Sequence, residues 1–126
     1  MQLLPSAVRI YLAAEPVDLR KSIDGLSALV SARGHDPFSG HLYVFQSPRR
    51  NRIKILTWDQ GGFVLYYKRL ERGRFRLPHV SDKARTVEMD GTELGMLLDG
   101  IDVRRVRRPP KWEPRRAEGA SAPSSG

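Results

Sequence analysis

The sequence predicts a small α+β fold: an antiparallel sheet of about four to five strands, one main helix, a short C-terminal helix and a disordered basic tail. Short runs rich in β-branched and aromatic residues are separated by turn residues, which is typical of strands. Two other stretches carry aliphatic residues three and four positions apart, which is typical of helices. The chain of 126 residues fits one domain, which we assign to 1–103, followed by a tail over 104–126.

Apolar patterning predicts where the strands lie. The predicted strands cover 8–14, 41–47, 52–59, 63–70 and 84–89. The glutamine and two glycines at 60–62 suit a short hairpin loop between the third and fourth strands. Because side chains alternate across a strand, Lys54 and Trp58 share one face of the third strand. Tyr66 and Lys68 likewise share one face of the fourth. A register that pairs these two sets would create one basic and aromatic surface, and the sequence leaves that register open.

The helices are predicted from aliphatic spacing and from their end residues. Asp18 is the predicted N-cap of the main helix, and Gly34 suits its C-terminal stop. The inward face of this helix carries Leu19, Ile23, Leu26 and Val30. A second, shorter helix is predicted over 92–100. The tail that follows is basic and then rich in proline, alanine and serine, so we expect it to be disordered when free.

Positive charge is concentrated in the middle of the chain. The net charge is +8, and residues 49–85 hold eleven basic and three acidic side chains. Residues 86–103 hold five acids and no base. A neutral solvating surface interleaves both signs, whereas a patch of one sign attracts polyanions. The alternative is a solvated face whose long side chains simply cover the sheet.

The candidate nucleic-acid-binding residues are the arginines and lysines of this middle segment. Arginine is the residue best suited to bind phosphate, because its planar guanidinium donates two parallel hydrogen bonds. No residue pattern that reads base edges is visible, so we expect contacts to the phosphate backbone. The predicted set is Arg49, Arg50, Arg52, Lys54, Lys68, Arg69, Arg72, Arg74 and Arg76.

The sequence carries no signature of catalysis, metal binding or a cofactor. It has no cysteine, and its three histidines stand at no recognised ligand spacing. It contains no P-loop, dinucleotide fingerprint or nucleophile elbow. We therefore predict a protein that is not an enzyme and takes no metal, cofactor or small-molecule ligand. It shows no signal peptide and no apolar stretch of about 18 residues, so we expect a soluble cytoplasmic protein without membrane contact.

Three stretches of the sequence resemble a known family. They are "VDLRKSIDGL" at 17–26, "DPFSGHLYVFQSPRRNRIKILTWDQGGFVLYYKRLERGRF" at 36–75 and "LLDGID" at 97–102. Together they resemble the TnpB-type (Orf2-like) accessory protein of the insertion-sequence sixty-six family of bacterial mobile elements. The resemblance covers roughly residues 3–103. Ser22 departs from the family pattern, which commonly has glycine at that position.

The resemblance implies an accessory role in transposition. A separate, larger transposase is thought to perform the strand chemistry in this family. The implied partners are that transposase and the DNA of the element ends, and the implied location is the bacterial cytoplasm, in association with the nucleoid. Two alternatives stay open. One is an adaptor that bridges proteins without affinity for DNA. The other is a small toxin-like ribonuclease without metal, which would use Lys54, Tyr66, Arg72, Arg74 and His79.

Overall fold

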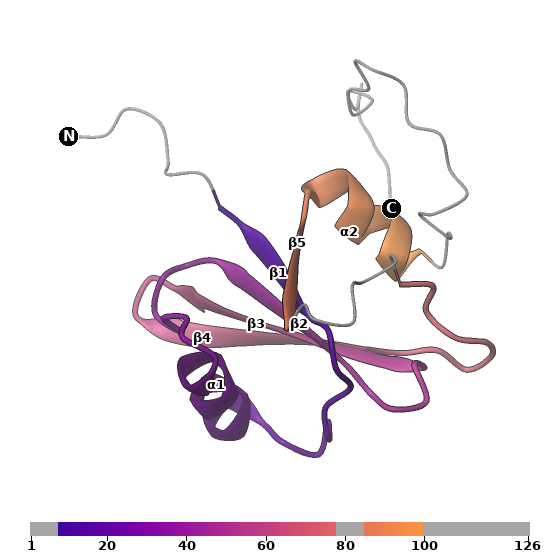
Figure 1. The fold of residues 1–126 in the computed structure, drawn as a ribbon, viewed down its shortest axis with the longest axis horizontal. Helices are drawn as coiled ribbons and strands as arrows, with labels where there is room; N and C mark the ends of the chain where they lie inside the picture. The colour runs from indigo at the N-terminus through magenta and orange to yellow at the C-terminus, as the bar shows by residue number, and fades with distance from the viewer. Residues whose placement is uncertain (1–7, 78–84, 100–126) are drawn as a thin grey trace.

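The computed structural model describes residues 8–77 and 85–99, and it confirms the predicted α+β class. The elements in chain order are β1 (Ile10–Ala13), α1 (Ile23–Ala32), β2 (Leu42–Gln46), β3 (Arg52–Asp59), β4 (Gly62–Arg69), β5 (Thr86–Met89) and α2 (Gly91–Leu98). The strands form one sheet in the order β4-β3-β2-β1-β5 (Figure 1). The predicted tail over 104–126 lies outside the described residues.

The sheet is mixed, not purely antiparallel as predicted. β1 and β2 run parallel, with Ile10 opposite Leu42, while β1–β5, β2–β3 and β3–β4 are antiparallel. A parallel pair needs a long crossover, because the chain must return to the end of the sheet from which it started. The segment between β1 and β2 supplies that crossover and contains α1.

The two helices cover opposite faces of the sheet (Figure 1). On one face α1 buries Leu26 and Val30 against side chains that include Tyr43, Phe45 and Leu56. On the other face α2 closes a second core of side chains from both helix and sheet, which includes Leu12, Val44, Ile53, Ile55, Phe75, Leu94 and Leu97. Fully burying one such side chain contributes about 1.5–3 kcal/mol. The sheet is therefore the middle layer, with a hydrophobic core on each of its faces.

The predicted N-cap of α1 is wrong. The helix begins at Ile23 and its N-cap is Ser22, four residues after Asp18. Asp18 instead begins a turn, in which Lys21 N donates to Asp18 O at 3.1 Å and Arg20 N donates to the Asp18 carboxylate at 3.0 Å. The predicted C-terminal stop is confirmed, because Gly34 follows the C-cap with a φ of 86°.

The register of the β3–β4 hairpin separates the residues that a combined basic and aromatic surface would need. Lys54 lies opposite Tyr67, and Ile53 lies opposite Lys68. Lys54 therefore belongs to the face that α1 covers and Lys68 to the face that α2 covers. The cause is the turn. Asp59 pairs with Gly62 across a loop of only two residues, both with positive φ, whereas the sequence interpretation placed Gly62 in the loop.

Candidate nucleic-acid interface

The turn between β2 and β3 presents the first group of predicted arginines. Arg50 N donates to Ser47 O at 2.9 Å, and Ser47 N donates to Arg52 O at 3.0 Å, which closes the turn. The Ser47 hydroxyl oxygen also accepts from Arg52 N at 3.2 Å. Arg49, Arg50 and Arg52 are all exposed on this turn. The backbone is thus well anchored while the guanidinium groups face solvent.

The backbone of Arg50 is strained. Its φ is 60°, in the left-handed region that glycine and asparagine adopt far more readily than other residues. A non-glycine residue held in such a sparsely populated region costs about 1–3 kcal/mol. The conformation directs the Arg50 carbonyl oxygen to the loop after β4, where it accepts a hydrogen bond from Phe75 N at 2.6 Å.

The loop over 70–77 carries the second group of arginines and is pinned to the first. Leu70 N donates to Asn51 O at 2.8 Å, in addition to the bond from Phe75 N to Arg50 O. Phe75 is only 1% exposed and lies in the core under α2. Alternation around this buried anchor leaves its neighbours Arg74 and Arg76 exposed, together with Arg72.

Seven of the predicted basic residues therefore meet at one end of the sheet. We name this surface the arginine end. In Figure 1 it corresponds to the two neighbouring loops at the right, which follow β2 and β4. The facing pair Arg52 and Arg69 joins the two loops across the hairpin. The arginine end comprises Arg49, Arg50, Arg52, Arg69, Arg72, Arg74 and Arg76, all of them exposed.

One acid lies within the arginine end. Glu71 accepts from Arg69 Nη2 at 3.0 Å and from Arg69 Nε at 3.2 Å. Both side chains are mostly exposed, and exposed ion pairs contribute about 0–1 kcal/mol. Within residues 8–77 and 85–99, no other ion pair involves an arginine of this set. Like charges in such proximity repel one another, so this surface favours a polyanion that would neutralise it.

The two predicted lysines are not part of the arginine end. Lys54 Nζ donates to the backbone oxygen of Lys21 at 2.9 Å and lies 5.3 Å from the centre of the Tyr67 ring. Lys68 Nζ donates to Leu98 O at 2.6 Å, at the last residue of α2. A cation at this position interacts favourably with the negative end of the helix dipole. We infer that these lysines tie the helices to the hairpin.

The residues suggested for a ribonuclease do not come together among those described. Lys54 and Tyr66 lie on opposite faces of the sheet, and His79 lies outside the described residues. Two of the five, Arg72 and Arg74, belong to the arginine end. The structure thus contains no arrangement of these side chains, in its described part, that would surround one phosphate.

Sequence reasoning did not foresee the ion pair that precedes α1. Arg20 donates to both carboxylate oxygens of Asp18, with Nη2 at 2.7 Å and Nε at 3.0 and 3.1 Å. These hydrogen bonds hold the pKa of the Asp18 carboxyl well below its usual value. The signal was present as an Asp-x-Arg pattern, which the N-cap interpretation obscured. Because its guanidinium is occupied, Arg20 is less available to an external anion.

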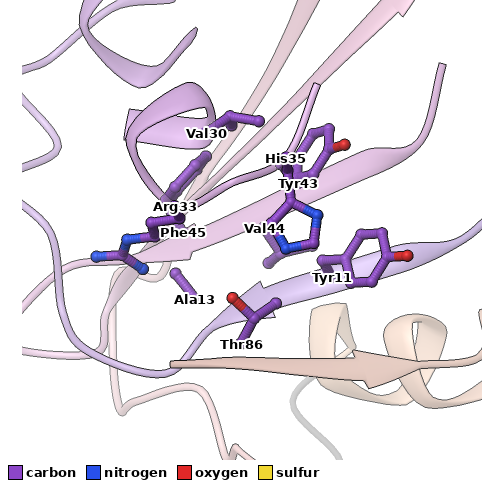
Figure 2. Close-up of a pocket in the computed structure, with 9 residues that line it drawn as sticks. All are labelled: Tyr11, Ala13, Val30, Arg33, His35, Tyr43, Val44, Phe45 and Thr86. Carbon is purple, nitrogen blue, oxygen red and sulfur yellow. The ribbon is translucent and has the colours of Figure 1, made fainter. Parts of the chain in front are cut away.

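The face under α1 also contains a small cavity (Figure 2). Its walls include Tyr11, His35 and Tyr43, with the Tyr11 and His35 rings 4.7 Å apart and the two tyrosine rings 5.7 Å apart. The cavity has a volume of about 20 Å³, enough for one water molecule but not for an organic ligand. Among the described residues, no three histidine, aspartate or glutamate side chains are grouped to hold a metal ion. Neither described helix has the length and apolar character of a membrane span.

Comparison with known proteins connects this geometry to a family. The model of the family described as "IS66 Orf2 like protein" matches residues 8–108. The uncharacterized protein y4jC of Sinorhizobium fredii is 41% identical over 108 residues, which cover 85% of this chain and 91% of the relative. The uncharacterized protein y4hO of the same organism is 32% identical over 115 residues, covering 89% and 96%. No solved structure matches the chain significantly. The chain therefore belongs to the IS66 Orf2-like protein family.

Proposed function

We propose that this protein is a non-catalytic accessory factor for transposition of an IS66-type element, and that it binds DNA through the arginine end. The family supports the accessory role in transposition. The proposed partners are the DNA at the element ends and the transposase of the same element, and the proposed location is the cytoplasm, on the nucleoid. In this role the protein helps to assemble the complex in which the transposase acts.

The observation that carries the proposal is the convergence of two arginine-rich loops that are separate in the sequence. A solvated face needs no such convergence. Two hydrogen bonds and the buried Phe75 hold these loops together, so the backbones that carry the arginines are positioned before DNA arrives. Preorganised loops lose less conformational entropy on binding than mobile ones. The contacts are proposed to reach phosphates, which position a protein on DNA without reading its sequence.

A salt series tests this proposal. The affinity for a duplex carrying the terminal repeat of the element is compared with that for a scrambled duplex. The double variant Arg72→Gln/Arg74→Gln should weaken binding to both duplexes and make the slope of log K against log salt shallower by about 1.8, since each phosphate contact contributes about 0.9. The control Arg9→Gln/Arg33→Gln removes the same charge outside the arginine end and should leave the slope unchanged. Equal losses in the two variants would contradict a specific interface.

An adaptor that contacts the transposase is the second candidate, and one observation favours it. Phe38 is 56% exposed, and the centre of its ring lies 5.0 Å from the ring centre of Trp58 and 5.3 Å from that of Phe63. Trp58 and Phe63 lie next to the β3–β4 turn, at the opposite end of the hairpin from the arginines. Exposed aromatic clusters are frequent centres of protein interfaces. Under this alternative, Phe38→Ala would weaken transposase binding, and no variant of the arginine end would matter.

A further inference from the structure

The outer edge of β4 is the most apolar exposed feature of the described residues. β4 is eight residues long, contains no proline and stands at one edge of the sheet. Of the five large hydrophobic side chains that are exposed within 8–77 and 85–99, three lie on this strand: Val64 at 49%, Tyr66 at 44% and Tyr67 at 50%. Val64 and Tyr66 project from the face that α2 covers and Tyr67 from the face that α1 covers, and all three remain exposed. A long edge strand of this kind is a template for pairing with another strand.

The hairpin determines which peptide groups face outward. Leu70 N donates to Asn51 O, so these residues form a hydrogen-bonded pair of the β3–β4 ladder. In an antiparallel ladder, hydrogen-bonded and non-hydrogen-bonded pairs alternate. The next pair, Arg52 with Arg69, is therefore non-hydrogen-bonded, and every second residue before it shares that state. The residues whose N–H and C=O groups point away from β3 are Phe63, Leu65, Tyr67 and Arg69.

We propose that β4 pairs antiparallel with β4 of a second copy of this chain, about a two-fold axis at Tyr66. In this register Leu65 faces Tyr67 of the second copy, and Phe63 faces Arg69. Every outward-facing peptide group of the strand then has a partner. A shift of two residues in either direction leaves outward groups unpaired at the strand ends. The two strands would join the sheets of both copies into one continuous sheet.

The charges of β4 favour this antiparallel arrangement. Lys68 and Arg69 stand at one end of the strand, and Gly62 and Phe63 stand at the other. Antiparallel pairing places Lys68 beside Val64 of the second copy and Arg69 beside the Phe63 ring, where a cation and an aromatic face attract. Parallel pairing would instead place like charges directly opposite each other, which is destabilising. Charged side chains often protect an edge strand from pairing with another chain. In β4 the charged residues stand at one end only, so the middle of the strand remains available for pairing.

The occupant is a second copy because the edge is complementary to itself. A two-fold interface uses the same patch on both subunits, so each residue and its counterpart must both be tolerated. At the axis, Tyr66 meets Tyr66 of the second copy as a non-hydrogen-bonded pair, in which side chains approach most closely. Two tyrosine rings pack well there, because aromatic cross-strand pairs stabilise a sheet. The exposed side chains of β4 near the axis are apolar in both copies.

Cysteine crosslinking tests the axis directly, since the chain contains no cysteine. Cα atoms in a non-hydrogen-bonded pair are about 4.5 Å apart, which lies within the range that a disulfide spans. Tyr66→Cys should therefore form a covalent dimer under mild oxidation. Val8→Cys is the control: Val8 is also exposed, at 57%, but it lies before β1 and away from this edge. It should remain a monomer on denaturing gels. Equal crosslinking of the two variants would contradict the proposed axis.

Sedimentation velocity over a concentration series tests the association without substitution at the axis. The wild-type chain should show a concentration-dependent dimer. Val64→Lys should be monomeric, because it sets a new cation beside Lys68 of the second copy, whereas Val8→Lys should still dimerise. A wild-type chain that sediments as a monomer at every concentration would overturn the proposal, and so would a dimer that persists in Val64→Lys. These measurements contain no DNA, so their outcome is separate from that of the proposed function.

The dimer would add to the proposed function, and this consequence rests on that function. The arginine end lies at the C-terminal end of β4, which includes Arg69. Antiparallel pairing points the two copies of β4 in opposite directions, so the arginine ends would lie at opposite ends of the joined sheet. Each could then hold a separate DNA segment. The Val64→Lys variant should keep its affinity for a single short duplex and lose the ability to hold two duplexes together.

Discussion

Arg50 occupies a position where its backbone conformation works against stability. Its φ of 60° is strained for arginine, yet its carbonyl oxygen accepts the hydrogen bond from Phe75 N that joins the two arginine-rich loops. Strain that persists in a well-anchored turn often accompanies function. We infer that the side chain is kept for its guanidinium, because Arg50 is exposed at the arginine end. At the residue scale, a positive charge at position 50 is thus present at a cost in stability.

The substitution Arg50→Gly should separate these two contributions. Glycine adopts positive φ without strain but is more flexible in the unfolded chain, so the free energy of unfolding should rise by about 0.5–1 kcal/mol. DNA affinity should fall, because one guanidinium is lost. Arg50→Ala should lose the same affinity without the gain in stability, because alanine keeps the strain. Chemical denaturation and a DNA-binding titration measure the two effects, and destabilisation by glycine would contradict the argument.

Glu71 should lower the affinity of the arginine end for DNA. It holds the Arg69 guanidinium in an exposed ion pair, so Glu71→Gln should release Arg69 and raise DNA affinity while changing stability by less than about 1 kcal/mol. Glu88→Gln is the matched control, since it breaks the exposed Arg9–Glu88 pair with the same change of charge. Titrations at one salt concentration should show a gain for the first variant that exceeds any gain for the second. Equal gains would indicate an effect of net charge alone.

At the scale of elements, the loop over 70–77 owes its place to one buried ring. Among the residues that the structure describes, Phe75 is the largest of the fully buried side chains, and it packs beneath α2 with residues of β1, β2 and β3. The loop itself is basic and polar on both sides of this residue. Without such an anchor, a charged loop of this kind would sample many conformations. The position of three arginines therefore depends on the hydrophobic core and not on the arginines.

Phe75→Ala should show this dependence. Truncating a buried phenylalanine to alanine costs about 3–5 kcal/mol, and the freed loop should bind DNA more weakly although no charge has changed. Phe75→Leu should retain most of both properties, because leucine fills more of the space. Phe38→Ala removes an equally large but exposed ring and should change stability much less. Thermal denaturation of the three variants, and DNA binding measured below their unfolding temperatures, test these expectations. Full DNA affinity in a folded Phe75→Ala protein would show that the loop needs no anchor.

At the scale of the whole molecule, distinct surfaces lie at different places on the sheet. The arginine end lies at one end of the β3–β4 hairpin. The aromatic cluster of the exposed Phe38 with the half-buried Trp58 and Phe63 lies at the other end, and the outer edge of β4 runs between them. A domain this small can offer several surfaces because its two cores lie on opposite faces of one sheet and leave the ends and edge free. This arrangement suits a protein that helps to assemble a complex.

Local patterns in the sequence were sufficient for the elements and for the concentration of charge. Alternation and aliphatic spacing located the strands and helices that the described part of the chain contains, because each pattern depends on residues only a few positions apart. Gly34 was recognised as a helix stop for the same reason. Asp18 is wrongly assigned as a cap because an aspartate before an apolar run fits both a helix N-cap and a turn, and the structure places Asp18 at the start of a turn that Lys21 N closes.

Only the tertiary structure decided which of the basic residues lie together. The parallel β1–β2 pair depends on the path of a crossover, and the β3–β4 register depends on whether one glycine belongs to the turn or to the strand. A change of register by one residue exchanges the faces of a strand, so the separation of Lys54 from Lys68 was not visible in the sequence. The arginine end likewise required Phe75 to fold back beneath α2. Patterns of neighbouring residues report local conformation, whereas contacts between distant segments are selected by the packing of the entire core.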